Sequence, residues 1–322
     1  MSIPPTPCSY PDVCVAVLNW NGQQHLEHLI PSLLAARANY AGRCRLLVLD
    51  NPSSADDLAW VRATFPSVET VASPENDFLY SYNWLLAQLK EPVVVLLNND
   101  LRVEPGFLEP LLCPFVDPAV FAVGARSLEW DGTAVTSAAY RMAMHHGWAY
   151  SDGFESQEPV YTFFAVGGFM AVDRLKFLQL GGFDRLYHPA YGEDSDICLR
   201  AWARGWTSVY QPRSTVWHRE GASWDGEQAV KRAYLMTRSQ YLFNNRNCRG
   251  LGDRIQRMLY LWILAGQKKK AGDLAWLAAI REARSQWRKL GKTAMNGSVD
   301  SRSIRDILQI VGCPWIHPTC RS

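Results

Sequence analysis

Three short aliphatic segments near the start of the chain constrain its fold more than any other feature. They span residues 13–18, 45–49 and 93–97, and each is followed directly by Asn or Asp. Such nearly continuous aliphatic runs are typical of strands that are buried on both faces of a sheet. The segments 23–37, 55–65 and 78–90 between them carry apolar residues at helical spacing, which predicts the order β-α-β-α-α-β. We therefore expect an α/β fold with a mostly parallel central sheet flanked by helices.

Polar residues stand at the carboxyl ends of these predicted strands. They are Asn19, Asp50, Asn98, Asn99 and Asp100. In open α/β sheets the ligand binds outside the carboxyl ends of the strands, so we expect these side chains to meet in one crevice. A carboxylate in the position of Asp100 can hold Mg²⁺ or Mn²⁺, which are hard ions that prefer oxygen ligands. Asp is also a common turn residue, so this segment alone leaves both interpretations open.

An acidic cluster opens a further predicted helix. Glu193, Asp194 and Asp196 precede a run that ends at Arg204 and Gly205, and this charge order is typical of a helix. The carboxylates repel one another, and the helix N-terminus offsets this by about 0.3–1 kcal/mol per exposed charge. The same field is expected to keep Asp194 ionised, as a general base must be. A purely structural N-terminal cap is the alternative interpretation.

Two further elements are expected between these clusters and the C-terminal part. A short helix is predicted after Asp173, a suitable N-cap, and before Gly181, a natural stop. His218 follows a short β segment at 211–217. A lone His among aromatic residues is commonly a packed core residue, but His218 could also join Asp100 on a metal ion.

Charge divides the chain near residue 250. Residues 251–322 carry 13 Lys or Arg against 5 Asp or Glu, whereas residues 1–250 carry 20 against 26. This basic part shows helical periodicity and no strand pattern, so we expect a helical C-terminal extension over 251–322. Its basic residues and the apolar run 259–264 fit a peripheral membrane contact, a helical lid or a homodimer face. A basic tail beside an acidic body argues against nucleic acid as the partner of the body.

Targeting and membrane-spanning segments are not visible in the sequence. The first residues lack a basic cluster and an apolar run. The longest strongly apolar stretch near the tail, 258–266, has nine residues, whereas a bilayer span takes about 20. We therefore expect a cytoplasmic location, with a peripheral contact at the inner face of the membrane as the alternative.

Five short segments follow one another in a specific order. They are VLNWNG at 17–22, VLDNPSS at 48–54, LLNND at 96–100, GGFD at 181–184 and GEDSDICLR at 192–200. Together they resemble the family 2 glycosyltransferases with the GT-A fold, in particular the bacterial rhamnosyltransferase-like branch. The resemblance covers about residues 12 to 220, and its most specific part is the GGFD block followed by the acidic helix start.

The resemblance implies roles for named residues and a division of the chain. It implies a Rossmann-like GT-A catalytic domain over 1–250, with a nucleotide-sugar-binding part at about 12–125 and an acceptor and catalytic part at about 126–250. Asp194 is expected as the catalytic base, and Asp100 and His218 as ligands of Mn²⁺ or Mg²⁺. Contacts to the nucleotide or donor are expected from Asn19, Asn21, Asp50, Asn83, Asn98 and Asn99. Contacts to the acceptor or sugar are expected from Gly168, Glu193 and Asp196.

The activity that these residues predict is metal-dependent sugar transfer with inversion. A divalent cation stabilises the leaving nucleoside diphosphate as a Lewis acid, and one carboxylate base suffices for direct displacement. The resemblance implies a nucleotide-diphosphate sugar as donor and a saccharide or lipid-linked acceptor, in cell-surface polysaccharide or glycoconjugate synthesis. A nucleotidyltransferase and a non-catalytic nucleotide-sugar-binding protein are the alternatives. The latter is favoured by Tyr80 and Tyr82, because the family often has small residues in this segment and bulky side chains are expected in the donor's path. Whether Asp77 in the same segment also alters donor binding is left open.

Overall fold

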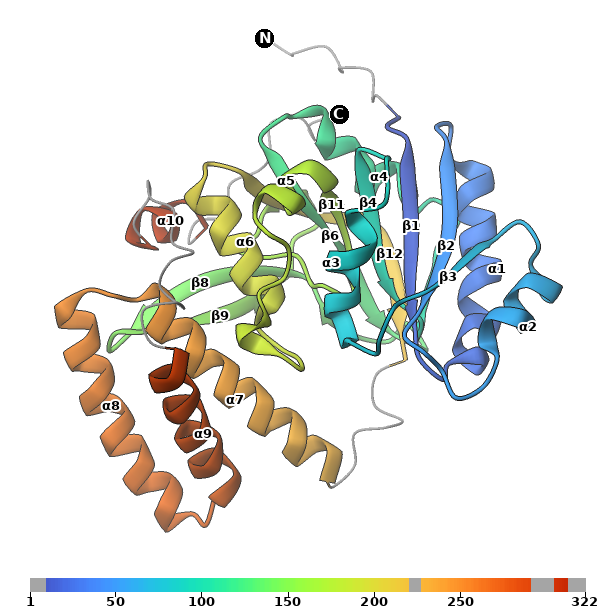
Figure 1. Cartoon of the computed structure of the whole chain (residues 1–322). Coiled ribbons are helices and arrows are strands. Elements are labelled where there is room, and N and C mark those ends of the chain that lie inside the picture. The colour runs from blue at the N-terminus through green and yellow to red at the C-terminus, as the bar shows by residue number, and fades with distance from the viewer. Residues whose placement is uncertain (1–9, 220–226, 291–303, 312–322) are drawn as a thin grey trace, which may run out of the picture.

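A mixed central sheet with helices on both faces forms the body of the molecule (Figure 1). The computed structural model describes residues 10–219, 227–290 and 304–311. The strands are β1 (Val13–Asn19), β2 (Cys44–Asp50), β3 (Glu69–Ala72), β4 (Val93–Asn98), β5 (Leu101–Val103), β6 (Val120–Glu129), β7 (Val135–Ser137), β8 (Ala139–His145), β9 (Trp148–Phe154), β10 (Val160–Tyr161), β11 (Phe169–Asp173) and β12 (Thr207–His218). The α-helices are α1 (Gln23–Asn39), α2 (Asp57–Thr64), α3 (Ser81–Leu86), α4 (Leu108–Leu112), α5 (Arg174–Gln179), α6 (Glu193–Ala203), α7 (Glu227–Asn247), α8 (Leu251–Lys270), α9 (Leu274–Leu290) and α10 (Ile304–Val311). Short 3₁₀ helices are η1 (Phe78–Tyr80), η2 (Cys113–Val116) and η3 (Arg185–Tyr187).

The strand order confirms the predicted, mostly parallel sheet. Within the described residues the order is β10-β12-β6-β11-β4-β1-β2-β3, with β5 beside β12 and β7 beside β6. β1 pairs in parallel with β2 and β4, β2 with β3, and β6 with β12. β11 lies antiparallel between β4 and β6 and joins the two parallel groups into one sheet. The chain runs from β1 outward to β3 and then returns to the other side of β1, which creates a topological switch point between β1 and β4.

Most predicted elements are confirmed, and two of the departures have local reasons. The three aliphatic strands, α1, α2, α5 and α6 form where the patterns indicate. β3 was not expected, because its four residues Glu69–Ala72 form a half-exposed edge strand without an aliphatic run. The single helix predicted over 78–90 is instead η1 followed by the short α3, because Phe78 has a left-handed φ of 52° at the start of the segment.

The core lies on both faces of the sheet. In β1, Val13, Val15 and Val17 belong to the layer beneath α1, whereas Cys14 and Ala16 face the layer that contains α3 and α6. The buried face of α1 consists of Leu26, Leu29, Ile30, Leu33 and Ala36. Burying one such aliphatic side chain stabilises the fold by about 1.5–3 kcal/mol, so the helices fix the sheet firmly enough to hold its strand ends in place.

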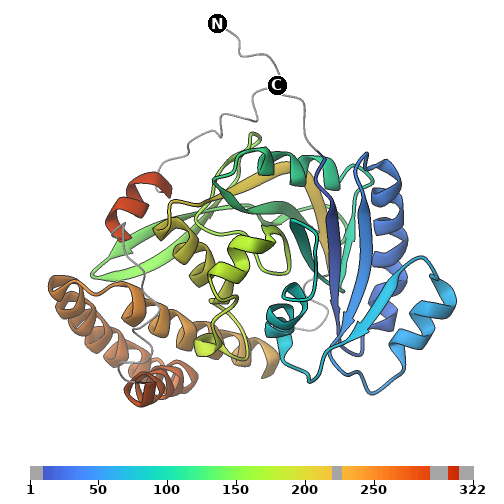
Figure 2. The same ribbon diagram turned by 45° about the horizontal axis from the view of Figure 1, so that its top comes forward.

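The C-terminal helices pack against this body and share its core, as Figure 2 illustrates. Leu261 of α8 and Ile280 of α9 belong to the same buried cluster as Trp202 of α6. The helical character predicted for the C-terminal part is therefore confirmed. Among the described residues, each helix falls short of the combination of length and apolar character that crossing a bilayer requires.

Candidate active site

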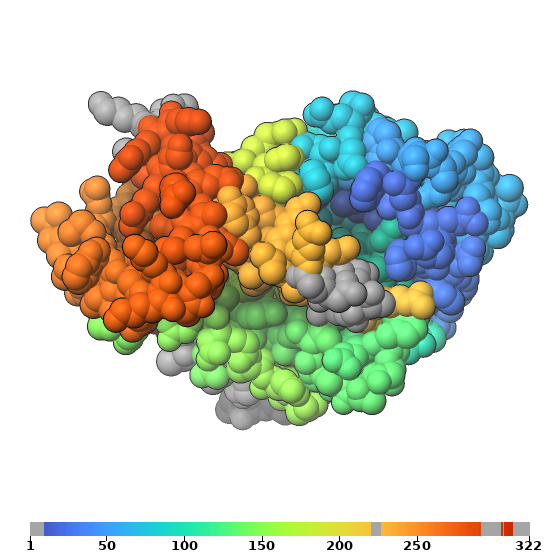
Figure 3. Space-filling model, turned by 90° about the horizontal axis from the view of Figure 1, so that it is seen from below, coloured from blue at the N-terminus to red at the C-terminus, as the bar shows by residue number. Residues whose placement is uncertain are grey.

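The carboxyl ends of β1, β2 and β4 lie in one row. In the sheet register Asn19 pairs with Asp50, and Leu18 pairs with Asn98, so the polar strand ends are neighbours as predicted. Figure 3, which looks at this end of the sheet, shows a hollow between the blue N-terminal segment and the green and yellow segments. The switch point between β1 and β4 lies at the same end, so the hollow is where a ligand of an open α/β sheet is expected.

Asn19 is the centre of a buried hydrogen-bond network beneath this hollow. Its Nδ2 donates to Asp50 Oδ1 and Asp57 Oδ2, both at 2.8 Å, and its Oδ1 accepts from Asn99 Nδ2 at 2.8 Å. The side chain is fully buried, so Asn19 supports the crevice from below. Sequence reasoning missed Asp57, which also accepts from the Gly22 amide at 2.9 Å. Nothing in the linear sequence marks Asp57, because it follows the N-cap Asp56 as an ordinary first-turn carboxylate.

Asp50 and Asn21 hold the loop after β2 against the loop after β1. Asp50 accepts from the amide of Ser53 at 2.9 Å and from its hydroxyl at 2.6 Å. Asn21, with a φ of 48°, accepts from the amide and hydroxyl of Ser54 at 2.7 and 2.9 Å. Between them, Trp20 exposes 57% of its surface at the rim of the crevice. These contacts shape a wall of the crevice, and the predicted donor contacts of Asp50 and Asn21 remain predictions.

The two predicted metal ligands lie together. Nε2 of His218 is 3.1 Å from Oδ2 of Asp100, because β12 brings His218 into register with Leu101. Oδ1 of Asp100 is buried and has no hydrogen-bond partner among the described residues. The described residues contain no group of three or more His, Cys, Asp or Glu that could hold a metal. This pair can therefore supply only part of a coordination shell, and a divalent ion would need further oxygens from a ligand and water.

A stack of Arg and Trp side chains borders the Asp100 and His218 pair. The guanidinium of Arg102 lies 4.8 Å from the ring centroids of both Trp130 and Trp217. Arg219 lies 5.4 Å from the Trp130 ring, and its amide donates to the Asp100 carbonyl at 2.9 Å. Sequence reasoning missed these arginines, although each is close in sequence to a predicted metal ligand. Their side chains add positive charge to this part of the molecule, and Arg102 also donates to the Trp130 carbonyl at 2.8 Å.

His25 of α1 is a further group near this pair that sequence reasoning missed. Burial lowers the pKa of His25, although the charge of Asp100 acts in the opposite direction. His25 is therefore favoured in its neutral form beside the carboxylate.

Asn98 and Asn99 each lie very close to a glycine, and the glycine beside Asn98 leads along the chain toward the acidic helix α6. A Cβ on Gly22 would lie 1.9 Å from Asn99 Nδ2, and a Cβ on Gly168 would lie 2.7 Å from Asn98 Nδ2. The amide of Asn98 also donates to the Gly168 carbonyl at 2.8 Å. Gly168 thus lets the backbone pass directly over the end of β4, and its predicted contact with sugar is untested.

Asp194 reaches the same place from α6. Its Oδ2 accepts from the Gly167 amide at 3.3 Å, and its Oδ1 accepts from the Ser195 amide at 2.7 Å. Burial raises the pKa of Asp194 despite these hydrogen bonds. The loss of solvation therefore outweighs the hydrogen bonds that favour the charged form, and the predicted ionised state of Asp194 stays a prediction.

Glu193, the neighbour of Asp194 in the chain, is also a buried carboxylate with a raised pKa. Burial, and next the charge of Asp194, raise the pKa of Glu193 to about 8. Its Oε2 is buried without a hydrogen-bond partner among the described residues. The raised pKa favours the protonated form of Glu193 at neutral pH.

Asp196 and Asn83 have roles other than the predicted ones. Asp196 is fully buried and accepts from the Tyr187 hydroxyl at 2.9 Å and from Arg200 Nε at 2.7 Å. Asn83 exchanges two hydrogen bonds with the backbone of Phe183, at 2.8 and 2.9 Å. Both side chains are engaged by protein, because each links two elements of the body. We therefore assign neither of them to the sugar or the donor.

The segment around Asp77 does not obstruct the crevice. Tyr80 and Tyr82 are 1% and 0% exposed, and the Tyr82 hydroxyl lies within hydrogen-bond distance of the Ala16 and Leu97 carbonyls, at 3.0 and 2.9 Å. The expected bulk in the donor's path is therefore absent, because the turn at Phe78 directs both rings into the core. Asp77 is buried as well.

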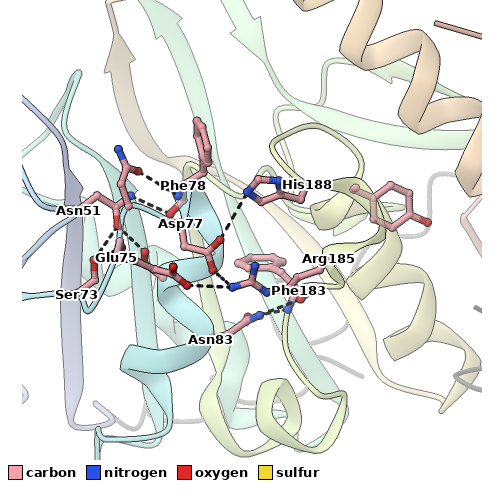
Figure 4. A network of polar contacts seen from close by, with 12 residues as sticks. Asn51, Ser73, Glu75, Asp77, Phe78, Asn83, Phe183, Arg185 and His188 are labelled. Carbon is pink, nitrogen blue, oxygen red and sulfur yellow. Dashed lines mark hydrogen bonds and ion pairs between the residues drawn. The ribbon is translucent and has the colours of Figure 1, made fainter. Parts of the chain in front are cut away.

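Asp77 instead belongs to a network that joins the segment before α3 to η3 (Figure 4). It forms an ion pair with Arg185, and its Oδ1 lies 3.6 Å from Nε2 of His188. The Nδ2 of Asn51 donates to the Phe78 carbonyl at 3.0 Å, which ties the same segment to the end of β2. The network therefore holds the segment before α3 against the end of β2 on one side and against η3 on the other.

A small cavity lies beside the N-terminus of α6. Its volume is about 270 Å³, and its lining includes Met142, Tyr150, Phe163, Ser195, Ser239 and Gln240. The hairpin of β8 and β9 forms one wall and α7 another. The lining combines aromatic rings with hydroxyl and amide groups, among them Ser195, which follows Asp194 in the chain, and this combination suits a ligand with hydroxyl groups and apolar faces.

The chain has sequence relatives over most of the body. Residues 11–240 match a family model described as glycosyltransferase-like family 2. The O-antigen biosynthesis protein RfbC of Myxococcus xanthus is 27% identical over 229 residues, which cover 67% of this chain and 18% of RfbC. A pre-mycofactocin glycosyltransferase of Mycobacterium tuberculosis is 28% identical over 221 residues, which cover 67% of this chain and 44% of that protein. The matched part therefore spans less than half the length of either relative.

A solved structure has a similar fold. It is a mannosyltransferase from Pyrobaculum calidifontis in complex with GDP-Man and Mn²⁺, with a TM-score of 0.57 and 15% sequence identity. The match covers 95% of this chain and 86% of that chain. At this identity the likeness concerns the arrangement of the elements.

Proposed function

Because the chain belongs to glycosyltransferase-like family 2 and has the GT-A fold, we propose that it transfers a sugar from a nucleotide-diphosphate donor to an acceptor hydroxyl. One observation carries this proposal: a continuous line of contacts runs along the crevice. It passes from Asp50 through Asn19 to Asn99, which is adjacent to Asp100 in the chain. It continues from Asn98 to Gly168 and from Gly167 to Asp194. These contacts link the residues that we propose for the nucleotide, the metal ion and the base.

Asp100 and His218 are the proposed ligands of a Mn²⁺ or Mg²⁺ ion. The buried Oδ1 of Asp100, which has no partner among the described residues, and the imidazole of His218 form a donor set that fits such an ion. The ion, when bound, supplies Lewis-acid stabilisation of the charge on the leaving diphosphate. The arginines beside this pair add positive charge from the protein itself. The Mn²⁺ complex of the similar mannosyltransferase supports the choice of metal.

Asp194 is the proposed general base. The Gly167 and Ser195 amides orient its carboxylate, and burial brings its pKa closer to neutral pH, which makes it a stronger proton acceptor. The acceptor is proposed to occupy the cavity beside Ser195, so that its hydroxyl loses a proton to Asp194 as it attacks the anomeric carbon. A single base with no separate nucleophile predicts inversion of configuration.

The name of the Myxococcus relative supports a part in cell-surface polysaccharide or glycoconjugate synthesis, with a saccharide or lipid-linked acceptor. A nucleotidyltransferase would use a similar sheet and metal, but it would release pyrophosphate instead of a nucleoside diphosphate. A non-catalytic binding protein was favoured by the tyrosines at 80 and 82, and their burial removes that argument.

Asp194→Asn separates catalysis from binding. We expect the variant to lose transfer by about 10²-fold or more, since positioned general bases contribute on that order. The rise in melting temperature with a nucleoside diphosphate and Mn²⁺ should remain, because the donor contacts lie elsewhere. Glu158→Gln, at an exposed carboxylate, is the matched control and should behave as the wild type. Equal loss of ligand-induced stabilisation would make Asp194 a binding residue, and retained configuration in the product by NMR would contradict direct displacement.

A further inference from the structure

The outer face of α8 exposes an unbroken apolar surface. Its members are Leu251, Ile255, Met258, Leu259, Trp262 and Ile263, which are 75%, 49%, 61%, 53%, 76% and 54% exposed. Their spacing places them on one side of the helix, opposite the buried Asp253, Arg257 and Leu261. We call these six residues the outer α8 face. In Figures 1 and 2 α8 forms the outer edge of the helical part of the molecule.

The inner face of α8 explains why the outer α8 face is held in this position. Arg257 is buried and donates to the carbonyls of Gly147 and Cys248, at 2.9 and 3.1 Å. Leu261 enters the core of the body. The helix is therefore anchored by its other side, and within the described residues the outer α8 face has no covering element. Contiguous exposed apolar surface of this kind marks an interaction site.

Basic residues are in excess in the part of the chain that forms α8 and α9. Residues 251–290 contain 9 Lys or Arg and 3 Asp or Glu. Lys268, Lys269 and Lys270 end α8. A groove of about 870 Å³ between α8 and α9 adds Arg281 and Arg288 among apolar residues, and none of its described lining residues is acidic. Lys269 contributes to this groove, so the basic groove and the end of α8 are continuous.

We propose that the outer α8 face lies on an anionic lipid bilayer, with its apolar side chains at the acyl boundary and the surrounding Lys and Arg at the phosphates. A helix with an exposed apolar face, an aromatic side chain at its centre and basic residues at its rim has the composition of an interfacial helix. Each basic residue near an anionic surface adds to the attraction. A second copy of the chain is a poorer partner, because two surfaces with the same excess of positive charge repel each other. The inference does not depend on the proposed function.

Co-sedimentation with lipid vesicles tests this proposal on the full chain. We expect binding to vesicles of phosphatidylcholine with phosphatidylglycerol at about 0.1 M salt, weaker binding at about 1 M salt, and little binding to phosphatidylcholine alone. Met258→Ser with Trp262→Ser should lower the partition coefficient about tenfold or more, because it removes the apolar anchor. Lys269→Glu with Lys270→Glu should have an effect of similar size, because it reverses charge at the rim.

Matched controls use exposed residues outside this region. Leu175→Ser removes an apolar side chain that is 56% exposed on α5, and Lys90→Glu with Lys231→Glu reverses the same number of charges elsewhere. Both should bind vesicles as the wild type does. The proposal is overturned if the wild type does not sediment with anionic vesicles, or if the control charge variant loses binding equally. It is also overturned if the chain forms a dimer that Trp262→Ser dissociates, since the outer α8 face would then belong to a second copy.

Discussion

At the scale of single residues, the candidate site contains side chains that are proposed to contact a ligand and side chains that hold their neighbours in place. Asn19 is fully buried and uses its amide hydrogen bonds on Asp50, Asp57 and Asn99. A sequence motif marks both kinds of residue in the same way, because both are polar residues at strand ends. Only the direction of each side chain separates them, and that direction depends on packing from distant parts of the chain.

The pair of Asp100 and His218 shows what the sequence can predict. Asp100 follows an aliphatic strand, and the resemblance to the family implied that His218 would join it. In the structure Oδ2 of Asp100 and Nε2 of His218 are 3.1 Å apart. Asp196 shows the limit of such reasoning. It lies two residues after Asp194, yet the turn of α6 directs it toward Arg200 and the core.

Glu193 should make the stability of the protein depend on pH. Its pKa is about 8 in the folded chain against 4.5 as the ordinary value, so the folded state binds more protons between these values. Stability therefore falls as pH rises through this range. Glu193→Gln cannot ionise, so we expect its melting temperature to decline less than that of the wild type between pH 5 and pH 8.

Thermal unfolding of the wild type, Glu193→Gln and Glu158→Gln across this range is the measurement. Glu158 is exposed, so its variant should keep the decline of the wild type. Parallel profiles for the wild type and Glu193→Gln would show that burial of Glu193 does not control this dependence.

At the scale of elements, the loops after the strands were harder to predict than the strands. A buried strand is marked by its own aliphatic residues, whereas β3 is fixed by its pairing with β2 and has no such run. The turn at Phe78 likewise depends on the Asn51 amide, which comes from another strand end. Local patterns do not contain this information.

Gly22 at the start of α1 is required for contact between two loops. A Cβ there would lie 1.9 Å from Nδ2 of Asn99, so Gly22→Ala must displace the Asn99 amide from Asn19. We expect a loss of about 1–3 kcal/mol in the free energy of unfolding, as for other overpacked sites, together with loss of transfer activity. Urea denaturation and a transfer assay measure the two effects.

Gly266→Ala is the matched control for this substitution. Gly266 lies within α8 with open space around it, so Ala should stabilise the helix by about 0.5–1 kcal/mol and leave transfer unchanged. If Gly22→Ala were equally harmless, the close approach of Asn99 would have no part in forming the crevice.

At the scale of the whole molecule, the fold class could be predicted because local patterns of apolar residues indicate the order of strands and helices. The division near residue 250 was predicted from the change in charge and from the helical, strand-free pattern of the C-terminal part, and neither property describes how the core is shared. In the structure Arg246 of α7 forms an ion pair with Asp184, and Gln286 of α9 donates to the Leu186 carbonyl at 2.9 Å. The helices on both sides of residue 250 thus contact the same part of the body.

Truncation after residue 250 should therefore destabilise the remaining chain. The truncation would expose the core residues beneath α8 and α9. It would remove none of the hydrogen-bond partners given above for the proposed catalytic groups, so we expect a loss of stability before a loss of catalysis. We expect a lower melting temperature and more aggregation than for the full chain, measured by thermal unfolding and size-exclusion chromatography. A truncated chain that melts as the full chain does would establish the C-terminal part as an independent unit.

The strand β6 has a consequence for exchanging parts between relatives. It spans Val120–Glu129, so it crosses the division at 125 between the predicted donor and acceptor parts, and it pairs with β11 and β12. In a chimera joined at that division, one protein would supply the first half of β6 and a different protein the second half. Donor preference is therefore more readily altered by grafting the loops that follow β1, β2 and β4 than by recombining halves.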